Sequence, residues 1–547
     1  MRSKFYPLLV LLILVGFAFR LVLLTAFPLR EDEAIYSFWA LHFLHEDPWF
    51  LHVWPDKPPL FIWLLSGAFA LWGESSASGR YLNVLLSTLT IPIVGTIARR
   101  LWGERAELIA VAAMTLNPFA ISFAPTLFTD PLLVFSATLA LYLAMTGVPF
   151  WSGLWLGVAI MTKQQGLLYL PLVLGVMLIG KTNKHSVGAV TNRTTYREQG
   201  ACGYKPHLHT LLQFLLGMLL IVTPVLLWDS QRWSVAPSPW DWSVHNYAPL
   251  TLVLVADWPQ RLRIWGDLLW YLTASGAVWG VLLVGILVWL LQTWRKRSAF
   301  VNPYPLLTRR ALRYSPTLFL LWSFGFIVLH LVTTLQPWDR YLLPLAPFLA
   351  LFISWLGSPS DMDSQTTNPQ FSFSLLTLLL LLFPAWQAAN GRLPIGGDHG
   401  AYRGLDTIIN ELNMTFEQEM PTVHNHSTIL YHRELGWHYR FYLYDQVRSH
   451  QVELRWYPSA VYLTDNASKA PHLRKFLIEP DWSPTQDLAF ALRVRGLVLQ
   501  QLRHIGNFTL FEIVQPSQAF CEWCRCRVER YPFPTLTTLS DKAMICK

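Results

Sequence analysis

The sequence predicts a polytopic α-helical membrane protein with a small α/β domain at its C-terminal end. Of the 547 residues, 53% are hydrophobic and only 14% are charged. Apolar runs of roughly 18–22 residues recur, and this length matches a hydrocarbon core of about 30 Å at the helical rise of 1.5 Å per residue. From Gly391 onward, short alternating segments replace these runs, which indicates a second domain outside the membrane.

The charge pattern indicates a membrane and does not require a nucleic-acid partner. The formal net charge is +8 and the pI is about 9.2. However, Lys and Arg lie in loops between apolar runs, and the positive-inside rule accounts for this distribution. Arg2 and Lys4 then place the N-terminus in the cytoplasm of a multi-pass protein of the plasma or inner membrane.

The first apolar run, Phe5–Phe27, is predicted to be an uncleaved helix, because it is long for a signal peptide and leads directly into further spans. Arg20 inside it is costly in lipid, and both an ion-pair role and a functional role stay open. An acid-rich first outer loop follows over residues 28–81. Ala34–His45 is predicted to be an interfacial helix, and so is Pro59–Trp72, with a short span as the alternative for the latter.

Further crossings bring the predicted total to about eleven helices by the length criterion. They are Leu82–Ala98, Ala106–Phe123, Leu132–Met145, Trp151–Thr162, Leu167–Ile179, Leu211–Trp228, Leu268–Leu291, Thr317–Thr334, Leu345–Trp355 and Phe373–Trp386. This path puts the large Lys/Arg clusters on one side of the membrane and the Asp-bearing loops on the other. The predicted domains are therefore a transmembrane domain over residues 1–390 and an extracytoplasmic domain over residues 391–547.

The extracytoplasmic domain is predicted to contain a helix over Leu405–Leu412 followed by short strands. The strands are Ser427–Tyr431, Val452–Tyr457, Val461–Thr464, Gly496–Gln500 and Asn507–Val514. Cys202 falls in a basic cytoplasmic insertion, and the other cysteines lie in the outer tail at Cys521, Cys524, Cys526 and Cys546. An outer location favours disulfides or unpaired thiols there over a metal knuckle.

Charged residues gather in loops that the predicted path places on the outer face. They are Asp32, Glu33, Asp56, Lys57, Asp130, Lys163, His245 and Arg340. Each has a structural alternative, such as a helix N-terminus for Asp32 and Glu33, a helix cap for Asp130, or charge neutralisation for the cations. Gathered at a lipid–water boundary, they suit transfer from a phospholipid-linked donor. There a carboxylate takes the proton of the attacking hydroxyl, and cations or a metal stabilise the leaving phosphate.

Five short motifs in these loops carry a resemblance. They are Asp32-Glu-Ala-Ile-Tyr36, Asp56-Lys-Pro-Pro-Leu60, Phe128-Thr-Asp-Pro-Leu132, Thr162-Lys163-Gln and Arg340-Tyr-Leu-Leu-Pro344. In their order and their side of the membrane, they resemble the GT-C glycosyltransferases that use polyprenyl-phosphate sugars. The nearest types are the dolichyl-phosphate-mannose protein mannosyltransferases and the bacterial aminoarabinose transferase of lipid A. The resemblance covers residues 1 to about 357.

The resemblance implies an inverting transferase of hexosyl or pentosyl groups, with a lipid, glycan or protein as acceptor. Asp32 matches the catalytic base, and Glu33 supports it or helps to hold the acceptor. The residues implied for the donor phosphate are Lys57, Lys163, Arg340 and Tyr341, with Tyr36 and Asp130 in support. Asp56 stands where the aminoarabinose enzyme has a metal-binding Glu, and His245 is the second candidate ligand. The shorter Asp leaves a divalent-metal site and a metal-free site both open.

Two other hypotheses compete with the transferase. A transporter or flippase of a lipid-linked or anionic substrate is favoured by Arg20 and by the short helices around Lys163. A scaffold whose outer domain binds a partner is the other, but it leaves the loop acids unexplained. The sequence shows no internal repeat, and the candidate site residues are predicted to lie at one membrane face. We therefore prefer the transferase.

Overall fold

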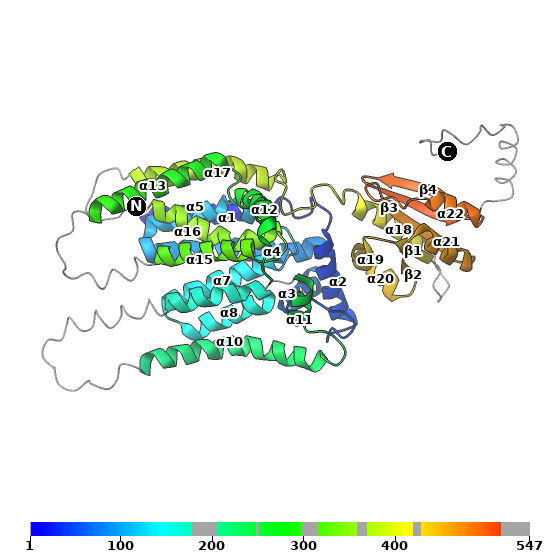
Figure 1. Cartoon of the computed structure of the whole chain (residues 1–547), viewed down its shortest axis with the longest axis horizontal. Helices are drawn as coiled ribbons and strands as arrows, with labels where there is room; N and C mark the ends of the chain where they lie inside the picture. Colours follow the sequence, from blue (N-terminus) through cyan, green and yellow to red (C-terminus); the bar gives the residue numbers. More distant parts are fainter. Residues whose placement is uncertain are drawn as a thin grey trace. The chain divides into compact units, whose positions relative to one another are not determined.

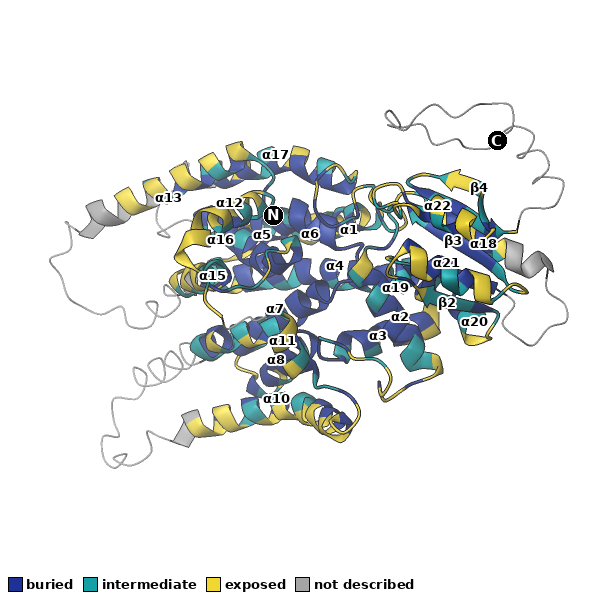
Figure 2. Ribbon diagram, turned by 45° about the vertical axis from the view of Figure 1, so that its right-hand side comes forward, coloured by how far each residue is buried: buried dark blue, intermediate teal, exposed yellow. Residues whose placement is uncertain are grey.

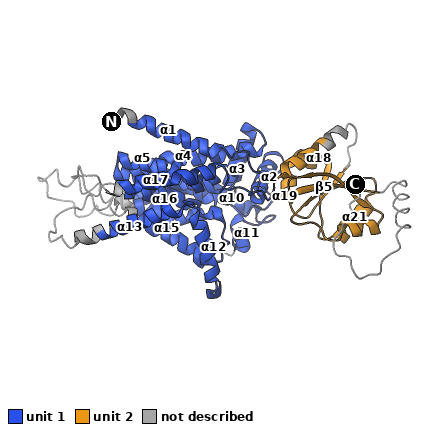
Figure 3. Ribbon diagram, turned by 90° about the horizontal axis from the view of Figure 1, so that it is seen from above, with its two compact units in different colours: residues 1–402 blue, residues 403–547 orange. Residues whose placement is uncertain are grey.

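The computed structural model describes residues 2–177, 205–247, 251–297, 315–357, 369–419 and 428–515. The chain divides into two compact units, residues 1–402 and 403–547 (Figure 3). Residues 391–402, predicted to open the C-terminal domain, fall in the first unit, where Gly391 and Gly397 pack against the ring of Phe27. The predictions for the five cysteines concern positions outside the described residues.

The elements described in the first unit are helices (Figure 1). Its helices are α1 (Arg2–Leu21), α2 (Glu31–His45), α3 (Leu60–Trp72), α4 (Ser76–Trp102), α5 (Glu104–Thr115), α6 (Pro118–Phe123), α7 (Asp130–Thr146), α8 (Pro149–Thr162), η1 (Gln164–Tyr169), α10 (Lys205–Arg232), α11 (Pro239–Tyr247), η2 (Val255–Asp257), α12 (Trp258–Trp270), α13 (Gly276–Arg297), α15 (Ser315–Val332), η3 (Asp339–Leu345), α16 (Ala346–Leu356) and α17 (Pro369–Ala389). Among the described residues, four helical segments are long and apolar enough to cross a membrane, namely Ser76–Trp102, Leu208–Arg232, Asp339–Leu356 and Ser372–Ala389, and shorter apolar helices accompany them. The predicted fold class is confirmed.

Helices at the centre of the first unit are buried, whereas peripheral helices expose apolar side chains (Figure 2). α7 is buried along most of its length. α10 instead exposes leucines along one side, including Leu212, Leu216 and Leu227. Leucine faces of this kind suit contact with lipid tails, which are as apolar as leucine itself.

α8 and α10 approach each other closely because glycines line their contact. A Cβ added at Gly153 would lie 1.9 Å from the Phe214 carbonyl oxygen, and one at Gly217 would lie 1.9 Å from the Phe150 carbonyl oxygen. Small residues at such contacts let two backbones pack directly in a membrane. This packing holds α8, and therefore Lys163 at its C-terminal end, in a defined position.

Two predicted spans are broken in the structure. The span predicted over Ala106–Phe123 consists of α5 and α6, because Asn117 begins a new helix by accepting a hydrogen bond from the Ala120 amide at 2.8 Å. The span predicted over Leu268–Leu291 consists of the end of α12 and of α13, with a turn between them in which Ala274 has φ +49°. Apolar composition alone did not distinguish these breaks from continuous helices.

Arg20 serves to hold three helices together. Its guanidinium donates to Ser87 Oγ on α4 and to the Met114 carbonyl of α5, each at 2.9 Å, and to Gly16 O on α1 at 2.9 Å. The carbonyls near a helix C-terminus carry partial negative charge, so they are suitable partners for a buried cation. These hydrogen bonds explain why Arg20 is buried. Neither the ion-pair role nor the functional role that the sequence left open is needed.

The second unit is a five-stranded mixed sheet with helices. Its elements are α18 (Leu405–Glu419), β1 (Thr428–His432), α19 (Gly436–Tyr442), α20 (Tyr444–Arg448), β2 (Val452–Trp456), α21 (Ala460–Lys469), β3 (Arg474–Pro480), α22 (Leu488–Val494), β4 (Val498–Ile505) and β5 (Phe508–Val514). The strand order is β2-β1-β3-β5-β4. β2, β1 and β3 are parallel, with Leu430 opposite both Leu454 and Phe476, whereas β5 and β4 are antiparallel.

The strand predicted over Val461–Thr464 is wrong, because these residues belong to α21. Ser459 caps this helix by accepting a hydrogen bond from the Tyr462 amide, and a side-chain cap of this kind favours helix over strand. Conversely, the central strand β3 was not predicted. Its apolar residues Phe476, Leu477 and Ile478 are all buried and form a continuous run without the alternation of a half-exposed strand.

Candidate functional site

The site begins at the N-terminus of α2, where Asp32 and Glu33 take different directions. Glu33 Oε2 accepts a hydrogen bond from the Arg30 amide at 2.9 Å, which satisfies a free N–H at the start of the helix. Glu33 is 1% exposed, whereas the Asp32 side chain is 34% exposed. Of the two adjacent carboxylates, Asp32 is therefore the one that a substrate can reach.

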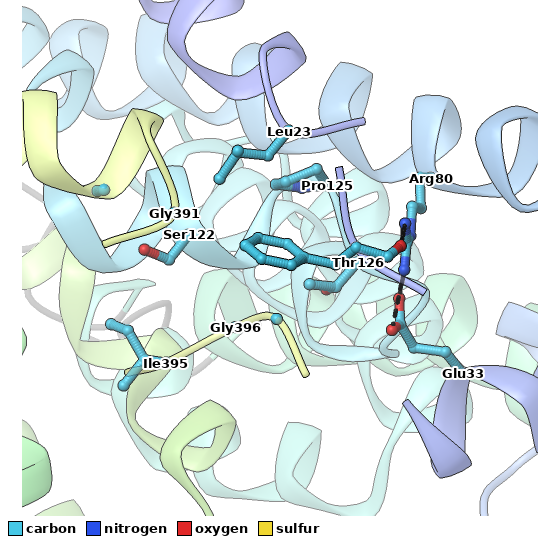
Figure 4. A pocket seen from close by; sticks show the side chains of 12 residues that line it. Leu23, Glu33, Arg80, Ser122, Pro125, Thr126, Gly391, Ile395 and Gly396 are labelled. Carbon is cyan, nitrogen blue, oxygen red and sulfur yellow. Dashed lines mark hydrogen bonds and ion pairs between the residues drawn. The ribbon is translucent and has the colours of Figure 1, made fainter. Parts of the chain in front are cut away.

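Glu33 is a buried anchor. Its two oxygens accept from Arg80 Nε at 3.3 Å and Arg80 Nη2 at 3.2 Å, and Oε1 also accepts from the Leu127 amide at 2.8 Å. The pair lies beside a pocket of about 300 Å³, including space open to solvent, which Ser122 and Gly396 also line (Figure 4). Because both oxygens already have donors, this geometry favours the supporting role for Glu33 over direct proton transfer.

Arg80 was not singled out from the sequence, although it connects α4 to the turn before α2. Its guanidinium donates to the Phe27 carbonyl at 2.6 Å and to the Pro28 carbonyl at 3.2 Å, in addition to Glu33. It thereby fixes the chain that leads into Asp32. The only signal in the sequence was a charged residue at the end of an otherwise uncharged stretch, and no motif marked it.

Asp32 forms an ion pair with Arg340. Arg340 lies in η3, close to the end of the first unit's sequence. Asp32 Oδ2 and Arg340 Nη2 lie 2.5 Å apart, and the Arg340 side chain is 5% exposed. Aromatic rings surround the guanidinium, whose Cζ lies 4.7 Å from the Phe128 ring centroid and 5.1 Å from that of Trp338. Arg340 Nη1 is buried and has no hydrogen-bond partner among the described residues.

Asp130 and Lys163 form a second ion pair. Lys163 Nζ lies 2.6 Å from Asp130 Oδ1, and both side chains are buried. The same ammonium lies 4.2 Å from the ring centroid of Tyr341, next to Arg340 in sequence. Asp130 Oδ2 has no hydrogen-bond partner in the described part of the chain. The partner observed for Asp130 is thus Lys163, from the neighbouring helix α8.

Asp56 and Lys57 form a third pair, which Tyr247 of α11 completes. Lys57 Nζ lies 2.7 Å from Asp56 Oδ2 and 3.1 Å from the Tyr247 hydroxyl, which itself donates to Asp56 Oδ2. Gln164 Nε2, beside Lys163, donates to the Asp56 carbonyl at 3.0 Å. Neither Tyr247 nor Gln164 was predicted, because their contacts depend on loops far apart in sequence.

These contacts decide the charge of Asp56. Burial by itself would raise the pKa of this carboxyl, but the Lys57 charge and the hydrogen bonds from Lys57 and Tyr247 outweigh burial and hold the pKa below its ordinary value. Burial and the adjacent Asp56 carboxylate raise the pKa of Tyr247. Asp56 is therefore ionised, and Tyr247 is neutral and acts as a donor.

Tyr36 lies close enough to these groups to interact electrostatically with Asp32, Asp56 and Arg340. It is buried against Trp39, with ring centroids 5.8 Å apart. Burial raises its pKa well above the usual value, and the charges of Asp32 and Asp56 add to this shift. Tyr36 therefore stays protonated and electrically neutral between two carboxylates.

We refer to the predicted residues that meet here, with Tyr247, as the outer-loop cluster. It consists of Asp32, Tyr36, Asp56, Lys57, Asp130, Lys163, Tyr247, Arg340 and Tyr341. Three carboxylates are paired with three cations, so the cluster as a whole is close to neutral. Such an arrangement can bind a phosphate with its cations and still present a carboxylate to a hydroxyl.

The predicted metal ligands do not form a ligand set. Asp56 already holds the Lys57 ammonium, which suits a carboxylate that binds no metal ion. His245 is exposed and stacks on Trp242, with ring centroids 5.8 Å apart. Among the described residues, no three His, Cys, Asp or Glu side chains group in a way that could hold a metal ion. The arrangement therefore does not fit the divalent-metal site that the resemblance left open.

The fold, with its charged outer-loop cluster, is similar to that of membrane proteins of the GT-C class. A model of the dolichyl-phosphate-mannose-protein mannosyltransferase family matches residues 56–192, which contain Asp56, Lys57, Asp130 and Lys163. A search of curated proteins by sequence gave no match. The resemblance predicted from the loop motifs is confirmed.

Solved structures extend the similarity to nearly the whole chain. ArnT from Cupriavidus metallidurans in the apo state is 15% identical, with a TM-score of 0.58, over 94% of this chain and 98% of that one. The same protein bound to undecaprenyl phosphate gives 16% identity and a TM-score of 0.57, over 92% of this chain and 97% of that one. The oligosaccharyltransferase of Archaeoglobus fulgidus gives 13% identity and a TM-score of 0.45, over 93% and 73%.

Proposed function

We propose that the protein is an inverting membrane glycosyltransferase, which moves a hexosyl or pentosyl group from a polyprenyl-monophosphate donor to an acceptor hydroxyl. The observation that carries this proposal is the pair of Asp32 and Arg340. It combines a partly exposed carboxylate with a buried guanidinium whose Nη1 has no partner in the described residues. A base and a phosphate ligand in direct contact are what this transfer needs at its reacting centre. The family match and the undecaprenyl phosphate bound by ArnT support the same donor class.

In the proposed reaction, Asp32 accepts the proton of the acceptor hydroxyl while the hydroxyl oxygen attacks the anomeric carbon. The bond from that carbon to the phosphate oxygen breaks, and polyprenyl phosphate leaves with the electron pair. A single displacement of this kind inverts the anomeric configuration. Phosphate is a good leaving group, so it needs positive charge more than it needs a proton donor.

The cations of the cluster supply that charge. Arg340 offers planar paired donors, which match two phosphate oxygens, and Lys163 and Lys57 add point charges. Phosphate binding at Arg340 competes with its contact to Asp32. The donor therefore releases Asp32 from its ion pair at the moment when a base is required. Tyr36 and Tyr341 would complete the site as neutral hydroxyls close to both charges.

Glu33 and Arg80 position this base without touching the reacting atoms. They hold the segment from Phe27 to Arg30, which leads into α2. Asp32 lies in the first turn of α2, so its position depends on this segment. We place the reaction on the outer face of the membrane, with the N-terminus in the cytoplasm, because the cluster consists of the Asp-bearing loops that the positive-inside rule assigns to that face.

The test uses the purified full chain in lipid nanodiscs with undecaprenyl- and dolichyl-phosphate sugars, and release of polyprenyl phosphate is measured. We expect Asp32→Asn to reduce release by about 10²- to 10⁴-fold, as for loss of a general base. Asp406→Asn, at a partly exposed carboxylate of the second unit, is the matched control and should retain activity. Near wild-type release by a folded Asp32→Asn protein would exclude Asp32 as the base. Transport of a lipid-linked sugar without bond cleavage would support a flippase instead.

A further inference from the structure

A further ion pair joins the two segments that carry Asp32 and Arg340. Arg30 Nη1 lies 3.5 Å from Asp339 Oδ2, and the two side chains are 20% and 12% exposed. Arg30 stands directly before α2, two residues from Asp32, and Asp339 directly precedes Arg340 in η3. We refer to Arg30 and Asp339 as the flanking pair. The start of α2 and the start of η3 are thus connected by two ion pairs of opposite polarity.

The ring of Phe128 supports one cation from each of these ion pairs. Arg30 Cζ lies 5.2 Å from the Phe128 ring centroid, and Arg340 Cζ lies 4.7 Å from it. Phe128 is itself fully buried. A guanidinium beside an aromatic ring is attracted by the negative charge of the ring face. The two arginines therefore share one fixed support, which relates the position of the flanking pair to that of the Asp32–Arg340 pair.

The backbone of Gly396 holds the flanking pair from a third segment. Its amide donates to Asp339 Oδ2 at 3.4 Å, and its carbonyl accepts from Arg30 Nη1 at 3.5 Å. Gly396 has φ +86°, and a Cβ added there would lie 2.3 Å from the Ser122 carbonyl oxygen, so the position requires glycine. Asp339 Oδ1 in turn accepts from the Arg340 amide at 2.9 Å, which fixes the backbone at the phosphate ligand.

The two ion pairs differ in what the donor phosphate does to them. In the proposed reaction, the phosphate takes Arg340 from Asp32, so this connection is lost when the base must stay close to the reacting carbon. Arg30 is held by Asp339 and Gly396, and these contacts do not involve Arg340 Nη2, which pairs with Asp32. The flanking pair can therefore persist when the phosphate binds.

We propose that Arg30 and Asp339 are positioning residues for the transfer reaction. Their ion pair keeps the start of α2 beside η3 while the donor phosphate separates Asp32 from Arg340. A displacement of about 1 Å at a reacting centre can cost about 10²-fold in rate, so this restraint has a direct effect on catalysis. The inference rests on the proposed function, and the experiment distinguishes failure of one from failure of the other.

The experiment measures single-turnover release of polyprenyl phosphate by the full chain in nanodiscs. Asp339→Asn removes the charge of the pair but retains Oδ1, the acceptor for the Arg340 amide. Arg30→Gln removes the opposite charge, and Arg30→Lys keeps it. Glu512→Gln is the matched control, because Glu512 forms a partly exposed ion pair with Arg474 at 2.9 Å in the second unit. Binding of undecaprenyl phosphate is measured separately by calorimetry.

We expect Asp339→Asn and Arg30→Gln each to slow release by about 10- to 10²-fold, and Arg30→Lys to recover part of the rate. Glu512→Gln should release polyprenyl phosphate at the wild-type rate. Affinity for undecaprenyl phosphate should stay close to wild type in all four variants, because the flanking pair does not bind the phosphate. Unfolding temperatures should also stay close to wild type, since partly exposed ion pairs contribute little to stability.

A double-mutant cycle with Asp32→Asn separates positioning from a merely structural role. Asp339→Asn should slow the Asp32→Asn protein no further, because no base remains to be positioned. A structural role would slow release by the same factor in both backgrounds.

Equal factors in both backgrounds, a wild-type rate for Asp339→Asn, or lost affinity for undecaprenyl phosphate would each overturn this inference while leaving Asp32 as the base. Full activity of Asp32→Asn alone would overturn the proposed base, and the inference with it.

Discussion

Arg340 Nη2 lies 2.5 Å from Asp32 Oδ2, so the two residues with opposite proposed roles neutralise each other before any substrate is present. The pair joins the first outer loop to η3, more than 300 residues later in the chain. Each partner protects the other from being an isolated charge near lipid. The donor phosphate competes for Arg340, and this competition links donor binding to the availability of the base.

Replacement of Arg340 should therefore affect donor binding and catalysis together. We expect Arg340→Gln to lower kcat by about 10²- to 10³-fold, the range seen when one preorganised charge stabiliser is removed. KM for the donor should rise as well, because a phosphate ligand is lost. Steady-state kinetics with a polyprenyl-phosphate sugar provides the measurement.

Arg340→Lys is the informative companion variant. It keeps the charge but loses the paired planar donors, so it should recover only part of the activity. Full activity of Arg340→Gln would contradict the assignment of Arg340 to the phosphate.

Glu33 should matter for stability more than Asp32 does. Glu33→Gln leaves the Arg80 guanidinium buried without its carboxylate, and breaking a buried pair from one side costs about 3–5 kcal/mol. We expect a larger drop in thermal unfolding temperature for Glu33→Gln than for Asp32→Asn, because both sides of the Glu33 pair are buried whereas the Asp32 side chain is partly exposed. Thermal unfolding of the detergent-purified proteins, monitored by tryptophan fluorescence, distinguishes them. If the two variants unfold at the same temperature, Glu33 is not the anchor.

Tyr247 should shift the acid sensitivity of the protein through Asp56. The Asp56 pKa is lowered in the folded state, so its stabilising contribution is present above the unfolded pKa of about 3.9 and is lost as pH falls through the folded value. Tyr247→Phe removes one of the hydrogen bonds that lower this pKa. We expect stability near pH 7 to fall, because the lost stabilisation is largest above the unfolded pKa, and the acid unfolding midpoint to move to higher pH.

The pH series runs from about pH 2.5 to pH 7, bracketing the ordinary carboxyl range. Tyr271→Phe, at a tyrosine in the turn after α12, is the control and should leave the midpoint unchanged. A midpoint that does not move, or that moves to lower pH, would show that Tyr247 does not stabilise the Asp56 carboxylate.

Chelation should leave sugar transfer largely intact. Lys57 occupies the Asp56 carboxylate and His245 stacks on Trp242, so the two predicted ligands are engaged elsewhere. We expect activity after prolonged EDTA dialysis to stay within about twofold of the untreated protein, and His245→Ala to behave likewise, since cations of the chain provide the phosphate charge. Loss of activity on chelation that a divalent ion restores would show that the reaction requires a metal.

Much of the candidate site could be predicted because charge is costly beside a membrane. Asp32, Lys57, Lys163 and Arg340 were recognisable as charged residues at the ends of apolar runs, in motifs with a known order. Their partners were not predictable in the same way. Tyr247 lies in an outer loop rich in tryptophan, and its contact with Asp56 joins residues 191 positions apart.

In the second unit, the local residue pattern predicted some strands correctly and others wrongly. β1, β2 and β5 were predicted close to their observed bounds, since their short apolar runs are separated by turn residues. Val461–Thr464 has β-branched and aromatic residues but forms a helix, because the Ser459 cap and the packing of Leu463 outweigh local strand propensity.

The sequence by itself determined the membrane class and the chemical types at the site, and it predicts the sidedness of the loops. It could do so because hydropathy and charge placement are properties of local segments. Only the tertiary structure decided that Glu33 faces Arg80 while Asp32 faces Arg340, and that Tyr247 donates to Asp56. The direction of a side chain and the identity of its partner depend on which distant segments pack together, and no local pattern records that packing.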